Sequence, residues 1–176
     1  MRLFVGISLS ENFIKELHNE TLPVRIDKSW RNIHTENWHV TTCFIGDFKG
    51  DVGIISEKIQ AITNDTASFS LDFNKITTVS FEKPRMVWFK GQRNPVFTEL
   101  CERLNRSILN KKPDHKPTPH ITIARSKKDE KPSIYKSELD LSLEVGEIQL
   151  WQSFLNQKGS NYKIIERFLL KGESQE

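Results

Sequence analysis

The residues best suited to chemistry in this sequence form a short pattern, His, apolar, Thr and one further residue, that occurs twice. The copies are residues 39–42 and residues 120–123. Both lie in stretches that alternate like β-strands, where residues i and i+2 share a face. Each copy therefore presents an imidazole beside a hydroxyl. One imidazole can give a proton while the other takes one, and the hydroxyls can hold oxygens, which suits an attack on phosphorus.

Length and composition are typical of a soluble globular protein. The chain has 176 residues, a net charge of +3 and 28% charged residues, so the charge balance permits a polyanionic partner without requiring one. The chain has two cysteines and no Cys-x-x-Cys motif, which favours free thiols. No leader-like segment or membrane-length apolar run is visible. These features predict a cytoplasmic protein without membrane contact, built as one bilobal domain over residues 1–176.

Periodicity predicts the elements of the first half. A strand is expected over residues 3–9, followed by a helix capped by Ser10 that ends before Pro23. The first His-x-Thr strand spans residues 38–45, and Asp51 caps the next helix. Alternating apolar residues between positions 69 and 90 indicate further strands.

The second half repeats this order. Asn94, followed by a proline at the first helical position, marks the start of a helix before the second His-x-Thr strand. A charged linker over residues 126–137 then leads to apolar stretches at 143–151 and 164–170, with a turn at 159–161. The predicted class is α+β, with two pseudo-symmetric lobes of mostly antiparallel sheet, helices on the outside and an active-site cleft between the lobes.

The chain resembles the RNA 2′,3′-cyclic phosphodiesterase (2′-5′ RNA ligase-like) family of the 2H phosphoesterase superfamily. The resemblance rests on both motifs and on flanking segments that keep the family order along nearly the whole chain. These segments are residues 1–4, 36–39, 44–46, 84–88 and 119–125, together with Ser153, Gly159 and Tyr162.

The resemblance implies hydrolysis of an RNA-terminal 2′,3′-cyclic phosphate to a 2′-phosphomonoester without a metal or other cofactor. It assigns His39 as the proton donor to the leaving oxygen and His120 as the proton acceptor that activates water. Thr41 and Thr122 would then bind the non-bridging phosphate oxygens, where charge builds as water adds. The two motifs are nearly symmetric, so the residues alone leave the direction of proton transfer open.

Other contacts with the substrate are suggested by position. Basic residues gather between positions 111 and 131, a stretch that could attract RNA phosphates. Arg125 has a family counterpart and is a candidate substrate-binding residue, although strict alternation points it away from His120. Trp38, Phe44 and Trp151 could stack a base but fit the core better, and Cys43, by alternation, shares the face of His39 as a wall residue.

The sequence leaves further interpretations open. A protein of the same fold could bind nucleotides or RNA without turnover, although both motifs are intact. RNA ligation through a 2′-5′ linkage is a side activity in the family, in which water competes with the RNA hydroxyl. A metal held by the two histidines would lack carboxylate or thiol partners. The expected partner is RNA with a cyclic phosphate end or a small cyclic nucleotide, bound by a monomer.

Overall fold

The computed structural model describes residues 1–21, 30–79, 85–126, 138–156 and 159–172. Three α-helices and nine strands occur in these ranges, with one short 3₁₀ helix at Thr35–Asn37. The helices are α1 (Glu11–Thr21), α2 (Val52–Thr63) and α3 (Pro95–Leu109). The strands are β1 (Arg2–Ser8), β2 (Trp30–Asn32), β3 (His39–Asp47), β4 (Phe69–Val79), β5 (Met86–Gly91), β6 (His120–Ser126), β7 (Glu138–Val145), β8 (Glu147–Asn156) and β9 (Gly159–Leu169).

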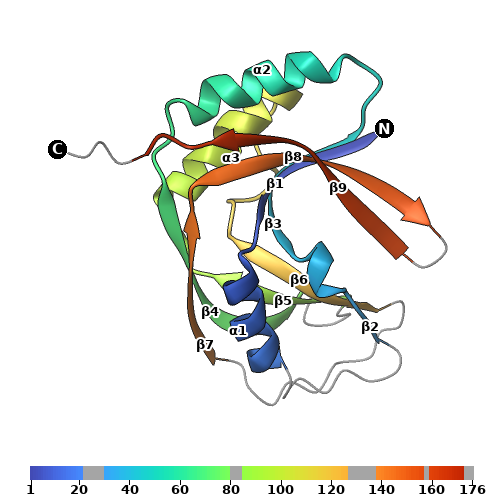
Figure 1. Cartoon of the computed structure of the whole chain (residues 1–176), viewed down its shortest axis with the longest axis vertical. Coiled ribbons are helices and arrows are strands. Elements are labelled where there is room, and N and C mark those ends of the chain that lie inside the picture. Colours follow the sequence, from blue (N-terminus) through green and yellow to red (C-terminus); the bar gives the residue numbers. More distant parts are fainter. Residues whose placement is uncertain (22–29, 80–84, 127–137, 157–158, 173–176) are drawn as a thin grey trace.

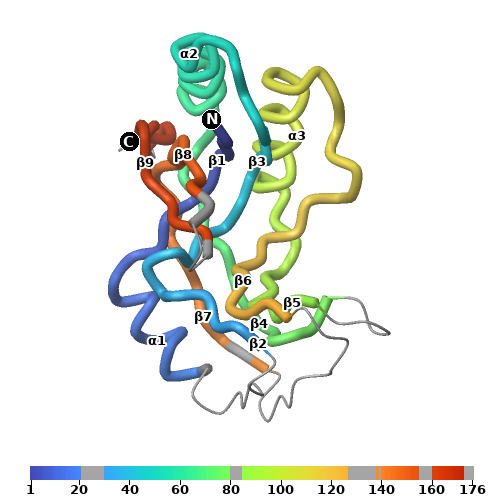
Figure 2. Tube along the Cα trace, turned by 90° about the vertical axis from the view of Figure 1, so that its right-hand side faces the viewer, coloured from blue at the N-terminus to red at the C-terminus, as the bar shows by residue number. Residues whose placement is uncertain are grey.

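The strands form an antiparallel sheet in the order β7-β4-β5-β6-β3-β1-β8-β9, with β2 beside β6. Its centre is its weakest join, because β3 and β6 are paired through the single couple Val40 and Ile121. The sheet therefore divides into two lobes, each built on four strands, and β2 adds a fifth strand to the lobe that contains β6. One lobe is β3-β1-β8-β9 and the other is β6-β5-β4-β7, and the two motif strands lie side by side where the lobes meet (Figure 2).

The helices begin where the sequence predicts. The Ser10 hydroxyl accepts a hydrogen bond from the Phe13 amide, and the Asp51 carboxylate accepts one from the Gly53 amide. The Asn94 side chain accepts from the amide of Phe97 at 2.9 Å, directly before the proline that opens α3. Each cap satisfies an amide that has no partner inside its helix.

The helices fasten the two lobes together. Helix α1 follows β1 of the first lobe, yet its Phe13 packs against Phe73 of β4 in the second lobe, with ring centroids 5.5 Å apart. Helix α3 follows β5 of the second lobe and packs on β3 of the first, and α2 lies beside α3 (Figure 1). One continuous buried cluster consequently runs through both lobes. Burial of a large apolar side chain contributes about 1.5–3 kcal/mol, so the shared core resists separation of the lobes.

The predicted fold class is confirmed, but some boundaries differ from the prediction. The apolar stretch at 143–151 is divided at Gly146 into β7 and β8, which belong to different lobes. Residues 159–161 open β9 and pair with β8, so the predicted turn at these positions is wrong, because strand pairing overrides their local turn preference. Positions 127–137 of the predicted linker lie outside the described residues. No helix in the described part of the chain is long and apolar enough to cross a membrane.

Candidate active site

The first motif opens strand β3. His39 and Thr41 are half-buried and share one face, while Val40 is fully buried on the other. Apolar packing of Val40 holds the strand, and the alternation of strand side chains leaves the imidazole and the hydroxyl together outside the core.

The second motif repeats this arrangement at the start of β6. His120 and Thr122 are half-buried on one face, and Ile121 is fully buried opposite them. Because Ile121 pairs with Val40 across the join between the lobes, the two motifs are held next to each other.

One cavity of about 550 Å³ takes in both motifs. His39, Thr41, His120 and Thr122 all line it, which is the shared groove expected from the pseudo-symmetric halves. The rest of its wall comes from both lobes and comprises Arg2, Phe4, Arg31, Asn32, Ile33, His34, Asn37, Phe44, Met86, Trp88, Arg125, Ser153, Ser160 and Tyr162. None of these described wall residues is an aspartate or a glutamate, so the charged groups around the cavity suit an anion.

Backbone carbonyls orient both imidazoles in the same way. Nδ1 of His39 lies 2.8 Å from the Asn37 carbonyl oxygen, and Nδ1 of His120 lies 2.9 Å from that of Thr118. A carbonyl only accepts hydrogen bonds, so Nδ1 carries the hydrogen in each ring and Nε2 has the lone pair when the ring is neutral. Nε2 of His39 accepts from the Thr41 hydroxyl at 3.1 Å. Nε2 is thus the nitrogen available for proton transfer in both motifs.

The two imidazoles have different aromatic surroundings. His39 lies among three rings of the first lobe, with centroid distances of 4.8 Å to Phe4, 5.1 Å to Tyr162 and 5.9 Å to Trp151. His120 is stacked on the indole of Trp88 at 3.8 Å, with 20° between the ring planes. His39 is therefore enclosed and dehydrated, whereas the face of His120 lies on a ring that attracts cations.

Burial makes both imidazoles reluctant to hold a charge. It lowers the pKa of His39 to about 4, because the ring loses the hydration that would stabilise its cation; the hydrogen bond to the Asn37 carbonyl opposes this effect, and the charges of His120 and Arg125 add to it. Burial is also the largest cause that lowers the pKa of His120. At neutral pH, both rings are therefore mainly neutral in the free protein.

β-Bulges change which residues face the cavity. In β3, Cys43 pairs with Val5 and Thr41 with Gly6, so Thr42 has no partner and the alternation shifts by one residue. Cys43 is consequently 2% exposed in the core, and the expectation that it lines the pocket is wrong. Burial raises the pKa of its thiol to about 12. Phe44, expected in the core, lines the cavity and is 53% exposed.

An equivalent bulge lies in β6. Ala124 pairs with Val87 and Thr122 with Trp88, which leaves Ile123 without a partner in β5. The shift turns Arg125 onto the same side as His120 and Thr122, where it lines the cavity. The objection to Arg125 from strict alternation therefore does not apply, and its place in the wall agrees with a substrate-binding role.

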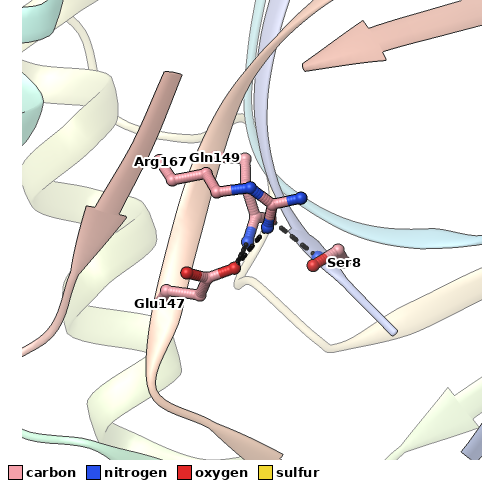
Figure 3. A network of polar contacts seen from close by, with 4 residues as sticks. All are labelled: Ser8, Glu147, Gln149 and Arg167. Carbon is pink, nitrogen blue, oxygen red and sulfur yellow. Dashed lines mark hydrogen bonds and ion pairs between the residues drawn. The ribbon is translucent and has the colours of Figure 1, made fainter. Parts of the chain in front are cut away.

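A polar network around the buried Gln149 supports the strand beside His39 (Figure 3). Ser8 is the cross-strand partner of His39, and its amide donates to the side-chain oxygen of the fully buried Gln149 at 2.8 Å. The amide nitrogen of Gln149 donates to Glu147, whose carboxylate also accepts from Arg167. Backbone pairing between β1 and β8 stops at Gly6. Beyond it, the side chain of Gln149 in β8 binds the Ser8 amide and holds the end of β1 in place.

Most of the predicted basic stretch lies away from the cavity or outside the described residues. Of its described members, Arg125 lines the cavity, whereas Lys111, Lys112 and Lys116 do not. The other arginines of the wall are Arg2 and Arg31. Trp38 and Trp151 are 6% and 7% exposed, which confirms their placement in the core.

The model of the 2′-5′ RNA ligase superfamily matches residues 16–154 of this sequence. The chain belongs to this superfamily. An RNA 2′,3′-cyclic phosphodiesterase of Aquifex aeolicus is 26% identical over 189 residues and is aligned over 98% of both chains. A Thermus thermophilus protein of the same name is also 26% identical, over 98% of this chain and 92% of its own. The predicted family is confirmed, and these relatives support the prediction of a phosphodiesterase.

Solved structures place this superfamily member in a known fold. The crystal structure of TT0787 of Thermus thermophilus matches 99% of this chain and 100% of its own, with a TM-score of 0.88 and 25% identity. Escherichia coli LigT complexed with 3′-AMP matches 96% of this chain and 97% of its own, with a TM-score of 0.80 and 22% identity. The two-lobed α+β fold is shared across the full length of these proteins.

Proposed function

We propose that this chain hydrolyses RNA 2′,3′-cyclic phosphodiester ends to 2′-phosphomonoesters by general acid and base catalysis with two histidines. The observation that carries the proposal is the single cavity that holds both His–Thr pairs and arginines but no carboxylate among its described wall residues. The relatives named RNA 2′,3′-cyclic phosphodiesterase support the substrate class.

The phosphate is seated by hydroxyl and guanidinium groups. Thr41 and Thr122 donate to the two non-bridging oxygens, one from each lobe. Arg125 adds a charge beside Thr122, and a guanidinium can contact phosphate with two parallel hydrogen bonds. These donors act where negative charge increases as water adds to phosphorus, so they stabilise the transition state more than the ground state.

The two Nε2 atoms carry the protons. His120 takes a proton from water, whose oxygen forms a bond to phosphorus. The bond from phosphorus to the 3′ oxygen breaks, and His39 gives its proton to that oxygen. The 2′ oxygen keeps the phosphate, which yields the 2′-phosphomonoester. Protonated His39 is regenerated by exchange with solvent, and His120 releases the proton that it gained.

Substrate binding prepares His39 for its role as acid. With a pKa of about 4, His39 is almost entirely neutral at pH 7 in the free protein. An anionic phosphate beside the ring favours the cation and raises this pKa. The same phosphate draws the Thr41 hydroxyl away from Nε2 of His39, because the hydroxyl can donate to only one acceptor. When the substrate arrives, Nε2 of His39 thus loses its hydrogen bond from Thr41 and gains a proton.

The proposed reaction assigns no step to a metal. Among the described residues, no three His, Cys, Asp or Glu side chains gather in a group that could hold an ion. Two imidazoles, two hydroxyls and Arg125 provide the proton transfers and the charge stabilisation. Activity that is unchanged in EDTA agrees with this scheme, and a loss that added Mg²⁺ or Zn²⁺ restores would contradict it.

The decisive experiment uses purified protein and a short oligoribonucleotide that ends in a 2′,3′-cyclic phosphate. The product is compared by chromatography with 2′-phosphate and 3′-phosphate standards, and the 2′-phosphate is expected. His39→Ala and His120→Ala should each lower kcat by roughly 10²–10⁴-fold, the usual contribution of a positioned acid or base. His115→Ala is the matched control, because His115 is exposed and outside the cavity wall.

Other products would point to other functions. A 3′-phosphate would mean that the 2′ oxygen leaves, which contradicts the proposed regiochemistry. Binding of the oligonucleotide without turnover would identify a nucleotide- or RNA-binding module. A joined product after addition of RNA with a free 5′ hydroxyl would identify 2′-5′ ligation as a side activity, which requires that hydroxyl to be held well enough to compete with water.

A further inference from the structure

An aromatic ring and a guanidinium form an exposed shelf in the first lobe, apart from the two motifs. The shelf consists of Arg2 of β1 and Phe44 of β3, with the Arg2 guanidinium carbon 5.2 Å from the centroid of the Phe44 ring. Phe44 is 53% exposed, Arg2 is exposed, and both line the cavity that contains the histidines. An exposed phenylalanine that lines a cavity is a ready surface for a planar ligand.

The backbone holds the shelf at a fixed place. The bulge at Thr42 turns Phe44 outward, and Arg2 opens β1, where it is paired on both sides, with Asp47 of β3 and with Ser153 of β8. Phe44 is three positions beyond Thr41, so at a strand rise of roughly 3.3 Å per residue its backbone lies up to about 10 Å from that of Thr41. The shelf is therefore displaced along β3 from the seat proposed for the reacting phosphate.

The positive charges of the cavity wall form two separate groups. Arg125 and Arg31 are cross-strand partners and belong to the second lobe, whereas Arg2 belongs to the first. Strands β3 and β6 are antiparallel, so Phe44 and Arg125, each five residues after its histidine, point to opposite ends of the cavity. The proposed function uses Arg125 of the second lobe for the reacting phosphate and assigns no role to Arg2, which can therefore hold another anion.

We propose that the Arg2–Phe44 shelf binds a second nucleotide of the RNA strand, with its base stacked on Phe44 and its phosphate held by Arg2. This proposal rests on the proposed function and extends it from the reacting group to the polymer. Proteins recognise single-stranded RNA by stacking bases on aromatic rings and guanidinium planes, and this shelf offers both. The preferred substrate is then an oligoribonucleotide end and not a cyclic mononucleotide.

The test compares two substrates that share the reacting group. One is a nucleoside 2′,3′-cyclic phosphate, and the other is a dinucleotide that ends in the same cyclic phosphate and contains one additional phosphodiester. The readout is the ratio of kcat/KM for the dinucleotide to kcat/KM for the mononucleotide. Phe44→Leu and Arg2→Gln should each lower this ratio about tenfold, within the range of one stacked base or one phosphate contact.

Matched controls isolate the shelf. Phe154→Leu makes the same change at a phenylalanine that is 44% exposed outside the cavity wall, and Lys49→Gln removes one exposed positive charge there. Both controls should retain the wild-type ratio. For Arg2→Gln, the salt dependence of dinucleotide binding should also weaken, because one contact between a positive charge and a phosphate is lost.

Each outcome bears on the proposal. An unchanged ratio in both shelf variants overturns it, and so does an equal loss on both substrates, which would place the terminal nucleoside on the shelf. Binding of a dinucleotide with a terminal 2′-phosphate, measured by titration calorimetry, tests the shelf without turnover. Weaker binding of the dinucleotide in both shelf variants, with unchanged binding of the matching nucleoside 2′-phosphate, supports the shelf even if wild-type protein cleaves neither substrate, a result that would refute the proposed hydrolysis alone. Unchanged binding refutes the shelf.

Discussion

Replacing Trp88 with leucine tests whether its indole stabilises the charged form of His120. The two rings are stacked with centroids 3.8 Å apart, and Trp88 is the cross-strand partner of Thr122 in the same motif. A cation over an aromatic face gains about 0.5–2 kcal/mol. The stack therefore favours the charged ring and raises the pKa of His120 relative to an apolar neighbour without an aromatic face.

Leucine keeps the site apolar but removes the ring, so the pKa of His120 is expected to fall in Trp88→Leu. The measurement is an NMR titration of the His120 ring, assigned by its loss in His120→Ala. Trp88→Phe, which retains an aromatic face, is the matched control and should remain closer to wild type. Trp88→Ala admits water, which relieves the burial that lowers this pKa, and should raise it.

The direction in which the pKa of His120 changes decides whether the indole stabilises the charged ring. Thermal melts must first show that the variants are folded. A pKa that rises in both Trp88→Leu and Trp88→Ala would mean that the indole acts only by excluding water. An unchanged pKa in Trp88→Leu would mean that the stack has no electrostatic effect. Either result would refute the reasoning from ring geometry.

Further predictions concern the other groups of the site. The pKa values of His39 and His120 in the free protein lie below 6.5, so kcat/KM should be greatest at acid pH and fall as pH rises above 6.5. The turnover number kcat should persist to higher pH, because the bound phosphate raises the pKa of His39. A kcat/KM that is constant up to pH 8 would contradict this. Thr41→Val and Thr122→Val should each lower kcat by roughly 10²–10³-fold in steady-state assays, as for a donor to developing charge, and losses below threefold would exclude that role. Arg125→Lys keeps the charge but loses the planar fork, so KM for the cyclic phosphate should rise about tenfold, and an unchanged KM would argue against a two-bond contact.

Local sequence signals predicted the parts of the fold that local interactions determine. Ser10, Asp51 and Asn94 cap their helices because the capping bonds join residues two or three positions apart, and such spacing is visible in a sequence. The burial of Val40 and Ile121 was likewise visible, because strand alternation is a property of a short segment.

The bulges could not be predicted in this way. Whether Thr42 or Ile123 lacks a partner depends on the register of the neighbouring strands β1 and β5, which are far away in the sequence. Each bulge reverses the faces of the residues that follow, so alternation misplaced Cys43 and Phe44 and left Arg125 in doubt. Register is set by the whole sheet, and a single strand does not contain it.

Part of the cavity wall could have been found from the sequence. Arg2, Phe4, Trp88 and Tyr162 all belong to segments that carry the family resemblance, although their role in the wall needed the fold to become visible. Arg31 gave no signal, because it reaches the cavity through the pairing of the three-residue strand β2 with β6.

The structure breaks the symmetry that the two motifs have in the sequence, and the difference supports the family's direction of proton transfer. In the first motif, the Thr41 hydroxyl donates to Nε2 of His39, so this nitrogen is occupied until a phosphate attracts the hydroxyl. In the second motif, Nε2 of His120 has no hydrogen-bond donor among the described residues, and the ring lines the cavity. A lone pair that is open before the substrate arrives suits the base that activates water. A nitrogen released only by the phosphate suits the acid, because its pKa rises at the same moment and its proton is delivered where the leaving oxygen develops charge.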